Sequence, residues 1–380
     1  MINLFEASTG NNLLPKSHNE DSYSYFNNSA RTEIIEMRKE MEAWFSEYPE
    51  PDKKDLKYTF INDFDAGFFE LFLFILFKKM GYAIKIHPSV PSSQKQPDFL
   101  ISGHGEEFYL EAKVSYYESQ EERSLAKRLG TLYDILDNAD IADFFIYLRK
   151  VKVKSSKQPR AKEILHAITE YFNSFDVAEL YHSMNSGVIS TSLWKVYEDD
   201  DIYIEYGPIP KNEEGRGQKA QRVIGAYGFE TKILKNVESL RRALKLKAGR
   251  YKALDKPYLI AINAIDMMGL DQNDVFDCLF GTTCIVPDQI GKSENTHEFR
   301  DHDGFFTGRN DQGQNTRVSA AFITKINVGN WKEAKYWITE NQKARLPISL
   351  RNSSLTTRFI QDDIIYRTPG GTFGDIFLLS

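Results

Sequence analysis

The chain has 380 residues, of which 41% are hydrophobic and 27% are charged. This composition excludes a disordered tail and a small fold that depends on disulfides, and the length is typical of one large domain or two ordinary ones. The 48 basic residues are outnumbered by 54 acidic ones, so the net charge of −6 excludes a protein that binds polyanions through bulk charge alone. Any surface for nucleic acid must therefore be local.

The chain carries no pattern that indicates secretion or membrane insertion. Its two cysteines are too few for a disulfide framework or a four-thiolate zinc site, which favours a reducing compartment. The N-terminus lacks a basic region followed by an apolar run, and the longest apolar stretch, residues 68–77, is interrupted by Glu70 and too short to span a membrane. We therefore expect a cytoplasmic protein with no membrane partner.

Residues 1–60 are expected to form an N-terminal helical arm. Apolar side chains between Thr32 and Tyr48 recur at helical spacing, which predicts an amphipathic helix. Pro49, Pro51 and the charged run after them end this helix. The arm is expected to pack on a core that begins near residue 61.

The core is expected to open with a helix followed by three strands. Residues 66–80 are apolar on every side apart from Glu70, which predicts a helix that is buried nearly all round. Turn-forming residues separate the strand-like segments that follow. These segments are residues 82–87, 98–102 and 107–115.

Residues 61–265 are assigned to this core, with an insertion at about 140–235. The insertion carries a strand at 144–153, a helix after Pro159 and, from its Pro, Gly and charge content, a loop at 207–221. The core resumes with a helix near residue 237 and the apolar run 258–264, which is typical of a buried strand. Residues 266–380 show a weaker pattern, with a strand expected at 318–326, and are expected to form a C-terminal extension packed on the core.

The candidate chemistry lies on the strands that follow the apolar helix. Side chains alternate along a strand, so Glu111 and Lys113 share one face. If the second and third strands form a hairpin closed by residues 103–106, Asp98 lies directly opposite Glu111. Opposed like charges repel, with Cβ atoms only about 5 Å apart. The pattern therefore predicts a positive charge between these two carboxylates.

A divalent cation is the candidate for that positive charge. Mg²⁺ prefers hard oxygen ligands and typically takes one or two carboxylates, which Asp98 and Glu111 can supply to Mg²⁺ or Mn²⁺. Glu70 joins them as a third metal candidate, because a lone carboxylate is costly to bury unpaired in an apolar helix. Lys113 can hold an attacking water or neutralise charge on a phosphate in the transition state. The structural alternative is local pairing of Glu70 and an exposed charged edge formed by Glu111 and Lys113.

Together these residues resemble the PD-(D/E)xK phosphodiesterase superfamily. The matching stretch runs from Glu70 through Gly81-Tyr82 and Pro97-Asp98 to Glu111-Ala112-Lys113. The resemblance implies an α/β fold with a restriction-endonuclease-like core, in which helices flank a mixed central sheet. It also implies that Asp98 and Glu111 bind the metal, that Lys113 is the catalytic lysine and that Glu70 supports the metal or water.

The chain as a whole is similar to a group of uncharacterised bacterial proteins, and this similarity supplies no activity. A role in bacterial genome defence or repair is implied only by the nuclease resemblance. The wider similarity rests on Trp44-Phe45, residues 247–251, residues 277–281 and residues 315–319.

Two basic segments stand out in this acidic chain. Residues 149–162 hold seven basic side chains and no acid, and the predicted helix 240–256 holds seven against Asp255 alone. Such segments are typical of a groove that follows phosphates, although a solvated helix face is the alternative. The residues that we assign to nucleic-acid binding are Lys152, Lys154, Arg241, Arg242, Lys245, Lys247 and Tyr251.

The sequence thus favours a metal-dependent nuclease that hydrolyses phosphodiester bonds, in DNA rather than RNA. Double-strand cutting by a single such site would favour a homodimer. Two alternatives stay open, namely a nucleic-acid-binding module without catalysis and a structural or interaction subunit of a larger complex.

Overall fold

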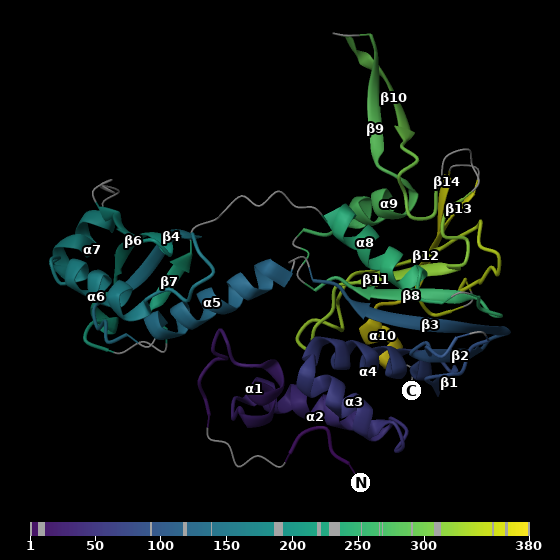
Figure 1. Ribbon diagram of the computed structural model, residues 1–380, viewed down its shortest axis with the longest axis horizontal. Helices are drawn as coiled ribbons and strands as arrows, with labels where there is room; N and C mark the ends of the chain where they lie inside the picture. Colours follow the sequence, from purple (N-terminus) through teal and green to yellow (C-terminus); the bar gives the residue numbers. More distant parts are fainter. Residues whose placement is uncertain are drawn as a thin grey trace. The chain divides into compact units, whose positions relative to one another are not determined.

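The computed structural model divides the chain into two compact units, and the second is inserted in the first (Figure 1). The first unit comprises residues 1–9, 32–117 and 234–380, and the second comprises residues 10–31 and 118–233. The second unit is wider than the expected insertion and takes part of the expected N-terminal arm. The structure describes residues 2–6, 12–91, 93–116, 120–137, 139–185, 193–218, 222–227, 236–251, 253–265, 267, 269–289, 292–307, 313–351, 353–361 and 364–378.

The first unit is a large mixed sheet flanked by helices, so the expected α/β class is confirmed. Its strand order is β1-β2-β3-β8-β11-β12-β13-β14. These strands are β1 (Ala83–Ile86), β2 (Phe99–Gly103), β3 (Glu106–Val114), β8 (Tyr258–Asn263), β11 (Ala320–Thr324), β12 (Tyr336–Glu340), β13 (Thr357–Gln361) and β14 (Ile364–Thr368). A separate two-stranded ribbon consists of β9 (Thr283–Gln289) and β10 (Lys292–Arg300). The helices are α2 (Thr32–Ser46), α3 (Lys53–Asn62), α4 (Phe64–Lys79), α8 (Asn236–Ala248), α9 (Gln272–Phe280) and α10 (Phe373–Phe377).

The C-terminal residues form half of this sheet, whereas the sequence suggested an extension packed on a finished core. Strand β11 runs parallel to β8 and antiparallel to β12, so β11 to β14 continue the sheet beyond β8. Every residue of β11 is buried. Strand β11 lies within the strand predicted at 318–326. Strands β12 to β14 have five residues each and mix polar with apolar side chains, so they lack the clear alternation by which a half-buried strand is recognised.

The β2–β3 hairpin has the register that the sequence predicted. Ser102 pairs with Glu107, and the loop is tighter than expected because Gly103 also pairs with Glu106. The two loop residues, His104 and Gly105, have φ angles of 53° and 84°. Positive φ at both central residues is the type I′ geometry, whose twist matches that of the flanking strands. The additional pair lies at the turn end of the β2–β3 ladder. The register of the rest of the ladder is the predicted one, so Asp98 still lies opposite Glu111.

The α4 helix covers one face of the sheet, as Figure 1 shows. It is buried on nearly all sides, as its sequence predicted, because α2 and α3 pack against it and α10 lies between it and the strands β11 and β12. Phe77 contacts the ring of Phe108 on β3, with 5.9 Å between centroids. The side chains of β3 alternate, so Phe108 lies on the face opposite to Glu111. The α4 helix therefore packs on the face that does not carry Glu111.

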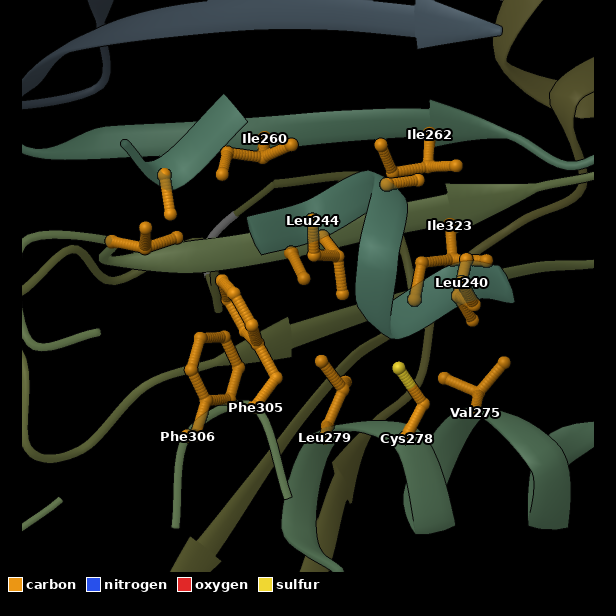
Figure 2. Close-up of a cluster of buried hydrophobic side chains, with 14 of the residues drawn as sticks. Leu240, Leu244, Ile260, Ile262, Val275, Cys278, Leu279, Phe305, Phe306 and Ile323 are labelled. Atoms are coloured by element: carbon orange, nitrogen blue, oxygen red, sulfur yellow. The ribbon is translucent and has the colours of Figure 1, made fainter. Parts of the chain in front are cut away.

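The opposite face is covered by α8 and α9, whose apolar side chains pack against β8 and β11 (Figure 2). Leu240 and Leu244 of α8 meet the strands, and α9 packs beside them. The α8 helix ends at Ala248, short of the predicted end near residue 256, and Gly249 follows the helix directly. Glycine at this position is a common helix stop.

The second unit has its own four-stranded sheet, in the order β5-β6-β4-β7, and its own apolar core. Part of the loop expected at 207–221 is strand, because β6 continues to Pro210. Its strands are β4 (Phe144–Val153), β5 (Lys195–Glu198), β6 (Ile202–Pro210) and β7 (Ile224–Tyr227). Its helices are α1 (Ser22–Asn28), α5 (Gln120–Asp137), α6 (Ala161–Phe172) and α7 (Val177–Asn185), with a short 3-10 turn at Glu213–Gly215.

Two leucines on α8 test the role of this core. Leu244 is fully buried, whereas Leu246 is 64% exposed. Leu244→Ala is expected to lower the free energy of unfolding by about 2–5 kcal/mol, because it leaves a cavity between α8 and the sheet. Leu246→Ala is the matched control, with an expected change of about 0.5 kcal/mol or less. Urea denaturation measures both, and equal losses would contradict the packing described here.

Candidate functional site

Asp98 lies just before β2 and is fixed by the backbone of both neighbouring strands. Its Oδ2 atom accepts a hydrogen bond from the N–H of Ala112, at 2.6 Å. Its own carbonyl accepts from the N–H of His87, at 3.0 Å. The side chain is half-buried. These contacts hold the carboxylate beside β3, at the point where the ladder register sets it opposite Glu111.

Glu111 is fully buried in the middle of β3 and is held by three donors. Lys247 Nζ donates to Oε1 at 2.6 Å, and Arg250 Nε lies 3.2 Å from the same oxygen. The hydroxyl of Tyr251 donates to Oε2 at 2.5 Å. Lys247 belongs to α8, and the other two residues follow its end. The positive charge expected beside Glu111 is therefore supplied by the chain itself.

The surroundings of Asp98 raise the pKa of its carboxyl group. Burial raises the pKa of Asp98 to about 8, and the negative charges of Glu111 and Glu70 contribute to the increase. The charge of Lys247 and the hydrogen bond from Ala112 act in the opposite direction without cancelling it. Burial and the two neighbouring carboxylates together therefore favour the protonated form of Asp98.

Glu70 lies on α4 and has a partner that the sequence did not indicate. The hydroxyl of Tyr48, which follows α2, donates to Glu70 Oε1 at 2.8 Å. Burial raises the pKa of Glu70, and the hydrogen bond from Tyr48 and the charge of His87 offset only part of that increase. Glu70 is therefore paired, but with a residue 22 positions earlier in the chain and not locally as the structural alternative expected.

The four predicted residues do not all share one face of the sheet. Lys113 is half-buried on the same face of β3 as Glu111, two residues further along the strand. Glu70 belongs to α4 on the opposite face, and its link to the others is the electrostatic effect on Asp98. The structure thus brings Asp98 and Glu111 together with Lys113 beside them. Glu70 lies on α4, the helix that covers the other face of the sheet.

Three of the residues assigned to nucleic-acid binding are engaged inside the first unit. Lys247 and Tyr251 hold Glu111, and Tyr251 is only 2% exposed. Arg241 pairs with Asp303 at 3.0 Å and donates to the carbonyl of Asp277. These side chains are therefore structural in this conformation.

The other four assigned residues are exposed. Arg242 and Lys245 lie on the outer face of α8, where they line a shallow hollow of about 390 Å³. Lys152 and Lys154 lie on β4 of the second unit, and Lys154 pairs with Glu198 at 2.6 Å. The exposed basic residues on α8 and those on β4 thus belong to different units.

Within the described part of the chain, no cluster of three or more His, Cys, Asp and Glu residues is arranged to hold a metal ion. A magnesium site does not require three protein ligands, since one or two carboxylates with waters and a phosphate are typical. Asp98 and Glu111 meet this smaller requirement in the type of their donor atoms. Both oxygens of Glu111 already have donors, so a cation there would compete with Lys247 and Arg250 for Oε1.

Comparisons with family models, curated proteins and solved structures gave no match for this chain. Among the described helices, none has the length and apolar character needed to cross a membrane.

Two contributors to the site were missed by sequence reasoning. Arg250 was one of several basic residues on a predicted helix, and nothing local indicated that it reaches Glu111. Tyr48 was counted only as part of an amphipathic helix. Lys247 and Tyr251 were singled out from the sequence for nucleic-acid binding, and in the structure both contact Glu111.

The ion pair between Lys247 and Glu111 is expected to be a strong structural contact. Lys247→Met should lower the free energy of unfolding by about 3–5 kcal/mol, because a buried carboxylate then loses its closest cation. Lys245→Met, two residues earlier on the exposed side of α8, should change it by about 0.5 kcal/mol or less. Chemical denaturation measures both variants, and similar values would show that the pair contributes little.

The raised pKa of Asp98 predicts a pH dependence of stability in the metal-free protein. The folded state holds the Asp98 proton up to about pH 8, whereas the unfolded chain releases it near 3.8. The folded state therefore binds more protons between these values, and the free energy of unfolding should fall as pH rises across them.

Asp98→Asn removes this titration and retains an oxygen that can accept from Ala112. Its stability should fall less steeply between pH 5 and 8 than that of the unaltered protein, with EDTA present throughout. Denaturation curves at several pH values measure the difference. Parallel pH profiles for the two proteins would contradict the assignment.

Proposed function

We propose that the protein is a metal-dependent nuclease that hydrolyses phosphodiester bonds, with a restriction-endonuclease-like core. The observation that carries this proposal is the hairpin register, which sets Asp98 opposite Glu111 with Lys113 on the same face. The proposed partner is DNA rather than RNA, and the proposed setting is the bacterial cytoplasm, in genome defence or repair. A homodimer is the form in which such a site would cut both strands.

The order of elements in the first unit supports this core. The α4 helix precedes the antiparallel strands β1, β2 and β3, and the later α8–β8 unit adds a strand parallel to β3. A helix with an acid, strands with Asp and Glu-x-Lys, and a later helix–strand unit are what the resemblance implies. The chain departs from a simple core in the strands β11 to β14, which extend the sheet past β8.

Each residue of the proposed site would have a role that follows from the chemistry of its side chain. Asp98 and Glu111 would supply the oxygen ligands of Mg²⁺ or Mn²⁺, and the metal would polarise the phosphate and a bound water. Lys113 would stabilise the negative charge that develops on the phosphate oxygens. The carboxylate of Glu70 is held by Tyr48, so Glu70 would act through its electrostatic effect on Asp98.

The electrostatics around Asp98 support a cation there. A carboxyl whose pKa is raised by neighbouring carboxylates is stabilised in its ionised form when a cation binds. Loading with metal would then release the Asp98 proton and weaken the contacts of Lys247 and Arg250 with Glu111 Oε1. Lys247 would be free to contact a phosphate, the role first assigned to it from the sequence.

A second function is a nucleic-acid-binding module without cleavage. The observation that favours it is the saturation of Glu111 by Lys247, Arg250 and Tyr251. In that case the exposed Arg242 and Lys245 would contact phosphates, and binding would weaken steeply with salt.

Cleavage of labelled DNA and RNA, in Mg²⁺, Mn²⁺ or EDTA, tests the proposal. Asp98→Asn and Lys113→Met should each lower the metal-stimulated rate by about 100-fold or more, because each removes charge stabilisation of the transition state. Lys39→Met, an exposed change on α2, is the matched control and should leave the rate unchanged.

Two outcomes would count against the nuclease. Cleavage that persists equally in all three variants would remove the assigned roles. Salt-dependent binding of the folded protein to DNA, with no cleavage in either metal, would replace the nuclease by the binding module.

A further inference from the structure

Two arginines face each other on β13 and β14, far along the sheet from Asp98. Arg358 and Arg367 are direct partners in the antiparallel ladder. Like charges in this position repel and destabilise a sheet. Strands β8, β11 and β12 separate β13 from β3, so this pair is distinct from the candidate nuclease site.

Arg358 is buried without a counter-charge among the residues that the structure describes. Arg358 is only 8% exposed, and within the described residues its Nη1 atom has no hydrogen-bond partner. Burial lowers the pKa of the guanidinium, and the charge of Arg367 lowers it further. A buried donor without an acceptor costs free energy, more so when it is charged. The arrangement is therefore unfavourable unless something accepts from it.

Both arginines line a pocket of about 480 Å³ between the start of α9 and strands β12 to β14. This volume lies in the range of small-molecule sites. Lys335 adds a third basic side chain, whereas the hydroxyls of Thr356 and Thr372 in the lining already donate to the Gly370 carbonyl and to Asp375. Of the two acids in the lining, Asp271 caps α9 by accepting from the N–H groups of Asn273 and Asp274, and Glu333 is exposed.

We propose that this pocket binds the phosphate group of a small phosphomonoester, with Arg358 and Arg367 as its principal ligands. A phosphate monoester carries a charge of about −1.5 to −2 near neutral pH, which matches two guanidinium groups. Arginine donors are arranged in a planar fork that recognises phosphate oxygens in pairs. The ligand supplies the counter-charge for Arg358 and Arg367 and reduces the repulsion between the two strands. The proposal does not depend on the nuclease function.

Thermal unfolding of the full chain tests the proposal, at constant ionic strength set with chloride. The probes are inorganic phosphate, AMP and adenosine. Phosphate and AMP are expected to raise the midpoint temperature and adenosine to leave it unchanged, since only the first two offer the dianion. Tighter binding of AMP than of phosphate would show that the pocket also holds the remainder of a nucleotide, and equal binding would identify phosphate alone as the ligand.

Three variants assign the effect to this pocket. Arg367→Ala alters an exposed side chain, and should weaken phosphate binding by about tenfold or more while the protein stays folded. Arg358→Met removes the buried charge, and should raise the midpoint without ligand and abolish the response to phosphate. Arg345→Ala, exposed and outside the pocket lining, is the control and should respond as the unaltered protein does.

Two results would overturn the proposal. One is an unaltered protein that responds to none of the phosphate probes, or to adenosine as strongly as to AMP. The other is a phosphate response that survives unchanged in both Arg367→Ala and Arg358→Met. A higher midpoint for Arg358→Met without ligand would separately show that the buried guanidinium destabilises the empty pocket.

Discussion

The buried carboxylate of Glu111 is the constraint on which the first unit depends. A fully buried ionised group is tolerated only when its charge and lone pairs are satisfied. Lys247, Arg250 and Tyr251 meet that condition, and all three come from the end of α8 and the segment after it. The carboxylate therefore ties α8 and the approach to β8 to the strand on which the candidate chemistry lies.

The same network determines how the site can respond to a cation. Glu111 already has its counter-charge, whereas Asp98 has neighbouring carboxylates and one backbone donor. Asp98 therefore keeps its proton up to about pH 8, and a cation that binds there must displace that proton. A ligand that brings positive charge would gain more from Asp98 than from Glu111, and would rearrange the end of α8 only if it also engaged Glu111.

The sequence predicted those parts of the fold that depend on residues close together in the chain. Side-chain alternation and a short turn were enough to place Asp98 opposite Glu111. The partners of Glu111 were beyond such reasoning, because Lys247 lies 136 residues away and only the tertiary fold brings it close. Of the C-terminal strands, β11 was predicted, whereas β12 to β14 were missed because each is only five residues long and mixes polar with apolar side chains without a clear alternation. The exposed and engaged arginines on α8 could not be told apart, since Arg241 and Arg242 differ only in what packs beside them.

The inserted second unit has a consequence for how the chain folds. Glu111 and Tyr251 are separated by 140 residues, and residues 118–233 of the second unit lie between them. Pairing of β3 with β8 must therefore close a very long loop, and contacts of this kind slow folding. An inserted unit with its own apolar core can collapse first. Its collapse would shorten the effective length of the loop that pairing of β3 with β8 must close. The order of assembly would then run from the inside of the sequence outward, and β3 would keep its acidic side chains in water until β8 arrives.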